Sequence, residues 1–174
     1  MRWRHALGVA LAALGPLLVA GCAGDEPYAG PCPAVFLLDE ARTTAVYRPG
    51  GGRDLSDVAF WLELSDLKSA CGFRGGLLAG VIDIEGSVVV RAEKGPEAIA
   101  NAVTFEIFST LVNRDGAVLR KALFPGLVRF AAGQSRAATV VAFESGVALL
   151  EEHSGDDYVV FVGFQSPARL KAAP

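Results

Sequence analysis

The sequence is poor in the residue types that build most catalytic and metal-binding centres. It holds two histidines, three cysteines and one methionine among 174 residues. His5 lies at the start of the first apolar run, so His153 is the one imidazole left to a domain that follows it. A Ser-His-Asp triad would have to use His153, and no G-x-S-x-G nucleophile motif occurs. The sequence therefore supports no catalytic assignment, and we expect neither a metal nor another cofactor.

Long hydrophobic runs are also scarce. Residues 6–20 form an uncharged run that would make a helix of roughly 22 Å, shorter than the ~30 Å hydrocarbon core of a bilayer. Arg2 and Arg4 precede this run, and small residues end it. A basic start, a short apolar run and a small-residue end are typical of a secretory signal peptide. We predict a signal helix over residues 1–21 and a mature chain that begins at Cys22.

The end of the apolar run carries a more specific signal. Val19-Ala20-Gly21-Cys22 resembles the lipobox of bacterial lipoproteins, which implies a diacylglyceryl group on the Cys22 sulfur and an acyl chain on its amine. Two or more such chains anchor a protein stably, at ~0.8 kcal/mol for each buried methylene. Ala23 stands where lipoproteins of the inner membrane often have Asp, so the periplasmic face of the outer membrane is favoured over the inner membrane. The alternative is an ordinary exported protein in which Cys22 is incidental.

A basic excess is missing too. Arg2 and Arg4 leave with the signal, so 16 basic residues fall to 14 against 19 acidic ones. Nucleic acids and anionic membrane surfaces need a basic face on their partner. We therefore expect no nucleic-acid partner and a contact with the membrane through the N-terminal lipid.

Cys32 and Cys71 remain after Cys22 is assigned to the lipid. Two thiols of an exported protein most often pair, and a loop of roughly 40 residues would stabilise the fold by about 4 kcal/mol. A metal site would need further ligands, and a redox pair would favour C-x-x-C spacing. We predict a structural disulfide between them.

The mature chain is organised as a short tether followed by strands. The tether over residues 22–31 is rich in Gly, Pro and acidic residues, and its nine residues after Cys22 extend at most ~30 Å. Residues 57–65 alternate apolar and polar side chains with a period of two, and residues 77–85 form a further strand that ends at Gly86. Residues 158–165 are apolar on both faces, which predicts a central strand.

About eight to ten short strands with frequent turn signals, and no long amphipathic helix, indicate an all-β fold. We predict an immunoglobulin-like β-sandwich over residues 32–167 and a C-terminal tail over residues 168–174. A small barrel is the main alternative.

Two places carry side chains that could serve function. Trp61 lies within the best alternating strand and is either a packed residue or part of a binding surface. Asp83 and Glu85 share one face of their strand, and paired acids can hydrolyse glycosides when a cleft raises one pKa. The simpler interpretation of the two acids is a solvated sheet face.

Several short pieces spread over the mature chain are similar to uncharacterised lipoproteins of alphaproteobacteria. They are Cys32-Pro33, residues 52–58 (GRDLSDV), Cys71, Lys94-Gly95-Pro96 and residues 162–165 (VGFQ). This resemblance implies an exported lipoprotein of unknown activity, transfers no active site and favours the Cys32–Cys71 pair.

Taken together, these features predict a non-enzymatic, lipid-anchored binding or scaffold module whose partner is an envelope protein or glycan. An envelope hydrolase or carbohydrate-active enzyme that uses acids such as Asp83 and Glu85 is the alternative. A third possibility, a carrier of small ligands, would need an enclosed apolar cavity in a barrel.

Overall fold

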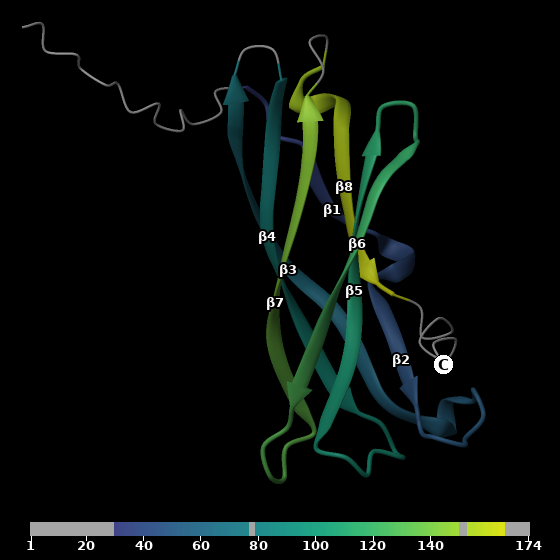
Figure 1. Ribbon diagram of the computed structural model, residues 1–174. Coiled ribbons are helices and arrows are strands. Elements are labelled where there is room, and N and C mark those ends of the chain that lie inside the picture. Colours follow the sequence, from purple (N-terminus) through teal and green to yellow (C-terminus); the bar gives the residue numbers. More distant parts are fainter. Residues whose placement is uncertain (1–29, 77–78, 150–152, 166–174) are drawn as a thin grey trace, which may run out of the picture.

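A computed structural model describes residues 30–76, 79–149 and 153–165, and the described chain is built almost wholly of β-strands (Figure 1). The strands are β1 (Ala34–Leu37), β2 (Thr43–Tyr47), β3 (Val58–Gly76), β4 (Ala79–Lys94), β5 (Ala102–Asn113), β6 (Val118–Arg129), β7 (Arg136–Leu149) and β8 (Tyr158–Phe164). Three short 3₁₀ helices join them: η1 (Asp39–Ala41), η2 (Leu55–Asp57) and η3 (Gly155–Asp157). Among the residues described, no helix is long and apolar enough to cross a membrane. The predicted signal helix, Cys22 and the tail at 168–174 lie outside the described residues.

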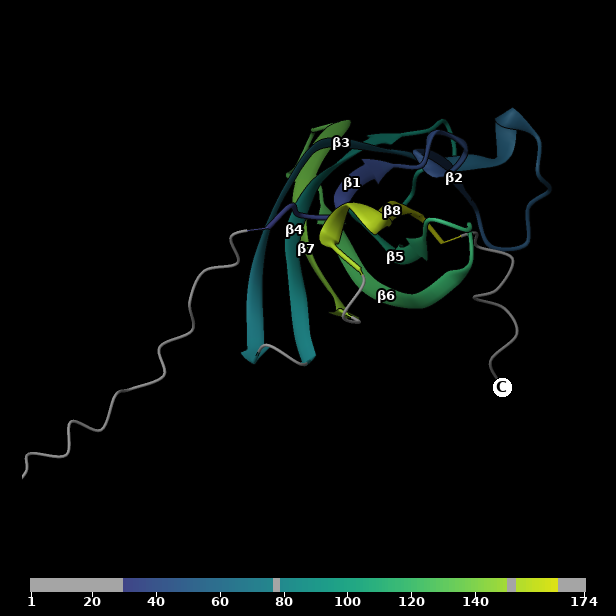
Figure 2. The same cartoon turned by 90° about the horizontal axis from the view of Figure 1, so that it is seen from above.

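The eight strands form two sheets that pack face to face. One sheet has the order β1-β8-β5-β6 and the other the order β2-β3-β4-β7. Seen from above, β3, β4 and β7 form one layer, and β1, β8, β5 and β6 form the layer opposite (Figure 2). The predicted all-β sandwich is therefore confirmed.

The alternation of buried and exposed side chains along the strands explains why the two sheets pack against each other. Phe60, Leu62 and Leu64 of β3 are buried between the sheets, whereas Trp61 and Glu63 point outward. This is the pattern expected when one face of a strand meets the core and the other meets water. Strand β8 lies between β1 and β5, which confirms the prediction that residues 158–165 occupy the centre of a sheet.

The strand order refines the immunoglobulin-like prediction. An immunoglobulin domain places strands A-B-E-D in one sheet and C-F-G in the other. Here β1-β8-β5-β6 and β7-β4-β3 have the same neighbours, with β2 added at the edge. Strand β1 takes position A, but β3 to β8 pass through positions G, F, E, D, C and B, the reverse of the immunoglobulin order. Local patterns of alternation carry no information on this direction, because it is set by which distant strands pair.

Two predicted strand ends are wrong. The chain continues through Ser65 and through Gly86, so that β3 and β4 form one long hairpin. A bulge carries β3 past Ser65, because Asp66 and Leu67 together oppose the single residue Val88 of β4. Gly86 is kept for packing rather than for a turn, since a Cβ there would lie 2.8 Å from the backbone oxygen of Lys68 and against the ring of Phe143.

The predicted disulfide is confirmed and fixes the start of the domain. Cys32 is bonded to Cys71 in the C-terminal half of β3, and their Cα atoms are 6.0 Å apart. Next to Cys32, the backbone of Pro31 packs so closely against Gly155 of η3 that no side chain fits at position 155. The segment that leads from the predicted tether is therefore held at the end of the sandwich that carries Cys71.

Candidate binding groove at Trp61

On the outward face of the sheet β2-β3-β4-β7, side chains of neighbouring strands lie in rows. The strand registers align residues from all four strands in two rows that run across the sheet. The first row is Ala45–Trp61–Glu93–Arg136, and the second is Thr43–Glu63–Arg91–Ala138. Neighbouring strands lie about 4.8 Å apart, so each row places a new side chain at about that interval.

These rows line a groove of about 720 Å³. Every member of the two rows except Ala45 lines it. The indole of Trp61 is 41% exposed, although the preceding and following residues of β3 are buried in the core. Of the two interpretations of Trp61, the structure therefore supports an aromatic residue on an open face.

The charged side chains around Trp61 are held in ion pairs across the strands. Glu93 pairs with Arg136 at 3.2 Å, and Glu63 pairs with Arg42 at 3.9 Å. All four side chains are about half exposed or more. Pairs as exposed as these contribute only about 0–1 kcal/mol each, so a ligand can take over their hydrogen-bonding groups at little cost.

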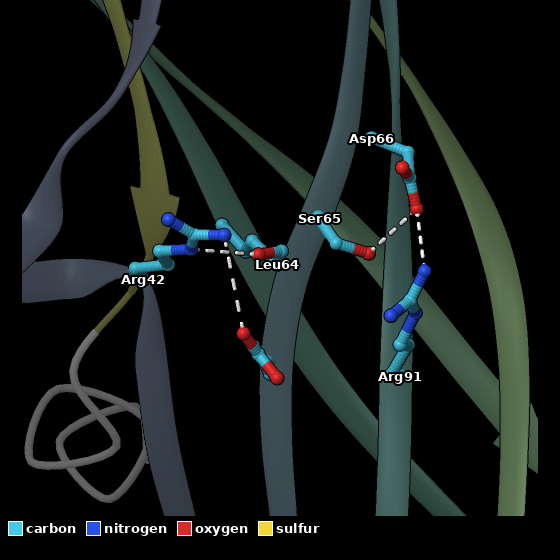
Figure 3. Close-up of polar contacts among 6 residues, drawn as sticks. Arg42, Leu64, Ser65, Asp66 and Arg91 are labelled. Atoms are coloured by element: carbon cyan, nitrogen blue, oxygen red, sulfur yellow. Dashed lines mark hydrogen bonds and ion pairs between the residues drawn. The ribbon is translucent and has the colours of Figure 1, made fainter.

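The bulge in β3 fixes the orientation of Arg91, which lines the groove. Asp66 has a φ of 49°, and this backbone conformation turns its carboxylate toward β4. There it accepts hydrogen bonds from Arg91 at 2.7 Å and from the Ser65 hydroxyl at 3.0 Å (Figure 3). Arg91 is thereby directed away from Glu63, its direct cross-strand neighbour. The Glu63 carboxylate is left with the longer contact to Arg42.

Arg42 is fixed from the opposite side. Its Nε donates a hydrogen bond to the backbone oxygen of Leu64 at 3.1 Å (Figure 3). The Leu64 N–H donates to the Arg42 oxygen at 2.9 Å. The backbone bond extends the β2–β3 ladder by one step. The Nε bond holds the guanidinium of Arg42 beside Glu63.

Asp83 and Glu85 lie elsewhere on the same sheet face. With Arg74, Arg120 and Glu144 they line a second hollow of about 430 Å³. Asp83 accepts a hydrogen bond from Arg74 Nη2 at 2.7 Å, and this bond together with the charge of Arg74 lowers the pKa of the Asp83 carboxyl. Glycoside hydrolysis needs one acid whose pKa is raised so that it can donate a proton. The environment of Asp83 lowers the pKa of its carboxyl instead.

His153 is exposed, and its ring centroid lies 6.1 Å from that of Tyr158. The pKa of the Tyr158 phenol is raised, first by burial and then by the charge of Asp157. Within the part of the chain that the structure describes, no three His, Cys, Asp or Glu side chains gather in a way that could hold a metal ion.

Sequence reasoning identified Trp61 but missed the charged side chains around it. Glu63 was visible as its neighbour in the alternation, whereas Arg91, Glu93 and Arg136 join the site through pairing between strands that are distant in sequence. Glu93 and Arg136 are 43 residues apart. The one local signal was the alternation of outward polar residues at positions 91 and 93.

Comparisons of the chain with family models, with curated proteins and with solved structures find no match. The groove is therefore interpreted from its own chemistry.

Proposed function

We propose that this chain is a lipid-anchored module of the cell envelope that binds another envelope component through the Trp61 groove and catalyses no reaction. The observation that carries the proposal is that Trp61 is 41% exposed and lines a groove of about 720 Å³. A large aromatic side chain with apolar faces and a polar N–H is enriched at binding surfaces, because it contributes much contact area at a small cost in conformational entropy.

The proposed anchor agrees with the position of this groove. Cys32, where the predicted tether meets the domain, is bonded to Cys71, and Cys71 follows Trp61 by ten residues along β3. At about 3.3 Å for each strand residue, the groove lies roughly 30 Å along the sheet from the attachment point. A lipid on Cys22 would therefore hold the domain at one end and leave the Trp61 groove away from the membrane surface.

Resemblance to alphaproteobacterial lipoproteins and the lipobox at residues 19–22 support a location on the periplasmic face of a membrane, with the outer membrane favoured. The acidic balance of the chain supports a partner other than nucleic acid. A hydrolase built on Asp83 and Glu85 receives less support, because Arg74 lowers the pKa of Asp83.

Capture of the partner from envelopes crosslinked in intact cells tests this proposal. The matched variants are Trp61→Ala, which removes the indole from the groove, and Val140→Ala. The second variant removes a 65%-exposed apolar side chain on the same sheet outside the groove. We expect one envelope component to be recovered with the wild-type protein and with V140A, and to be lost with W61A. Recovery of the bait alone, or equal recovery with W61A, would overturn the proposal.

A further inference from the structure

We infer that the Trp61 groove binds a neutral glycan strand, with a sugar ring against the indole and the ring hydroxyls on the flanking Glu and Arg side chains. The inference rests on the proposed function and names the chemical class of the ligand. It is argued from the charges, spacing and backbone pairing of the groove.

The charges that line the groove cancel. Glu63 and Glu93 contribute two carboxylates, and Arg91 and Arg136 contribute two guanidinium groups. In each row a side chain of one charge stands one strand away from a group of the other charge. A strongly anionic ligand would meet both carboxylates, and a strongly cationic ligand would meet both guanidinium groups, so either would face a repulsive contact. A ligand without net charge avoids both.

Hydroxyl groups suit this alternation of donors and acceptors. Each hydroxyl can donate one hydrogen bond and accept others, whereas a carboxylate only accepts and a guanidinium only donates. A hydroxyl placed at the Glu93–Arg136 pair can therefore satisfy both partners at once. Hydrogen bonds to charged groups are also stronger than neutral ones, which compensates for the removal of water from the pair.

Trp61 provides the apolar part of the site. Its direct neighbour on β2 is Ala45, and Ala138 lines the far side of the groove on β7. Both side chains are small, so neither of them covers the indole. A pyranose ring has one face of C–H groups and an edge of hydroxyls. That shape fits an exposed indole bordered by hydrogen-bonding side chains.

The backbone around Trp61 argues against a peptide. Peptides commonly bind sheets by adding a strand to a free edge, where main-chain hydrogen bonds supply the affinity. Here Trp61 and Glu93 lie on β3 and β4, the two inner strands of the sheet, which pair with strands on both sides. Around the indole the groove therefore offers side chains rather than unpaired main-chain groups.

Titration of the full chain with neutral oligosaccharides tests the inference. Trp3 and Trp61 are the only tryptophans, so the variant Trp3→Phe makes indole fluorescence report on the groove alone. The probes are hexasaccharides of glucose, mannose, galactose and N-acetylglucosamine, with a polyuronate hexasaccharide as the charged comparison. We expect saturable changes in Trp61 emission with at least one neutral probe and weaker binding of the polyuronate.

Calorimetric titration of that probe then assigns the contacts. Glu93→Ala and Arg136→Ala should each weaken binding about tenfold, the ratio that corresponds to a lost hydrogen bond to a charged group. W61A should abolish binding, and V140A should leave it unchanged. Absence of binding by all neutral probes, tighter binding of the polyuronate, or equal losses in V140A would overturn the inference.

The two proposals fail in distinguishable ways. If no neutral hexasaccharide binds but W61A still loses a protease-sensitive partner from crosslinked envelopes, the glycan inference is wrong and the proposed binding function stands. If no probe binds and W61A captures as much as the wild type, both are wrong.

Discussion

Trp61 on β3 and Glu93 on β4 are direct cross-strand neighbours on the outward face of their sheet. The residue that follows Trp61 is Leu62, which points to the other side and is 2% exposed. Adjacent positions of one strand thus serve different purposes, because alternate side chains of a strand point to opposite faces. Position 61 contributes to the groove, and position 62 contributes to the core.

This relationship predicts a separation of stability from binding. Trp61→Ala and Glu93→Ala should each change the free energy of unfolding by about 1 kcal/mol or less, because both side chains are substantially exposed. Leu62→Ala should cost about 2–5 kcal/mol through the cavity that it leaves. Urea unfolding followed by far-ultraviolet circular dichroism measures all three. Comparable losses at positions 61 and 62 would show that Trp61 is a core residue.

The disulfide predicts a large loss on removal of its cysteines. The double variant Cys32→Ala, Cys71→Ala should lower the free energy of unfolding by about 4 kcal/mol, because the unfolded chain regains the freedom that a loop of this length had lost. Cys22→Ala is the matched control and should leave the stability of the domain unchanged. Mass mapping under non-reducing conditions that finds both thiols free would contradict the bond.

The Arg74–Asp83 pair predicts a pH dependence. Arg74 holds the pKa of the Asp83 carboxyl below its ordinary value of 3.8. An acid whose pKa is lowered in the folded state stabilises the fold above its unfolded pKa of about 3.9, and this contribution is lost as pH falls through the folded pKa. Arg74→Gln should therefore raise the pKa of Asp83 and reduce stability at neutral pH. The difference from the wild type should shrink in acid.

Carbon-detected NMR titration of the Asp83 carboxyl measures this shift directly. Arg91→Gln is a suitable control, because Arg91 lies on the same sheet face but pairs with Asp66 rather than with Asp83. A wild-type pKa at or above 3.9, or equal shifts in the two variants, would show that Arg74 does not set the protonation of Asp83.

The lipobox predicts that the anchor depends on one sulfur atom. Cys22→Ala should abolish labelling by a fatty-acid analogue and release the protein from the membrane fraction, because the signal peptide leaves no other apolar segment of spanning length. Cys71→Ala removes a cysteine that the structure assigns to a disulfide, and it should keep the label. Unchanged labelling and fractionation of C22A would refute the anchor.

Much of the fold could be predicted because its signals are local. The alternation around Trp61 identified β3 and its buried face, and the apolar character of residues 158–165 placed β8 inside a sheet. The length of β3 could not be predicted in this way. The predicted strand end at Ser65 is wrong, because a bulge at Asp66 shifts the alternation by one residue and thereby hides the continuation of the strand.

The binding groove was predictable only in part. Trp61 stood out as an aromatic residue on the polar side of an alternating strand. Arg136 did not, because it reaches the groove only when β7 pairs with β4 in a particular register. A shift of that register by one residue would turn Arg136 to the other face of the sheet. Long-range pairing of this kind leaves no mark in the local sequence.

Photocrosslinking in living cells tests the binding role of the Trp61 groove most directly. A photoreactive amino acid replaces Ala138 inside the groove and, for comparison, Leu119, which is 50% exposed on the opposite sheet. We predict an adduct of one defined envelope component at position 138, its loss when Trp61→Ala is added, and none of that adduct at position 119. The same adduct at both positions, or its persistence with W61A, would contradict a binding site at Trp61.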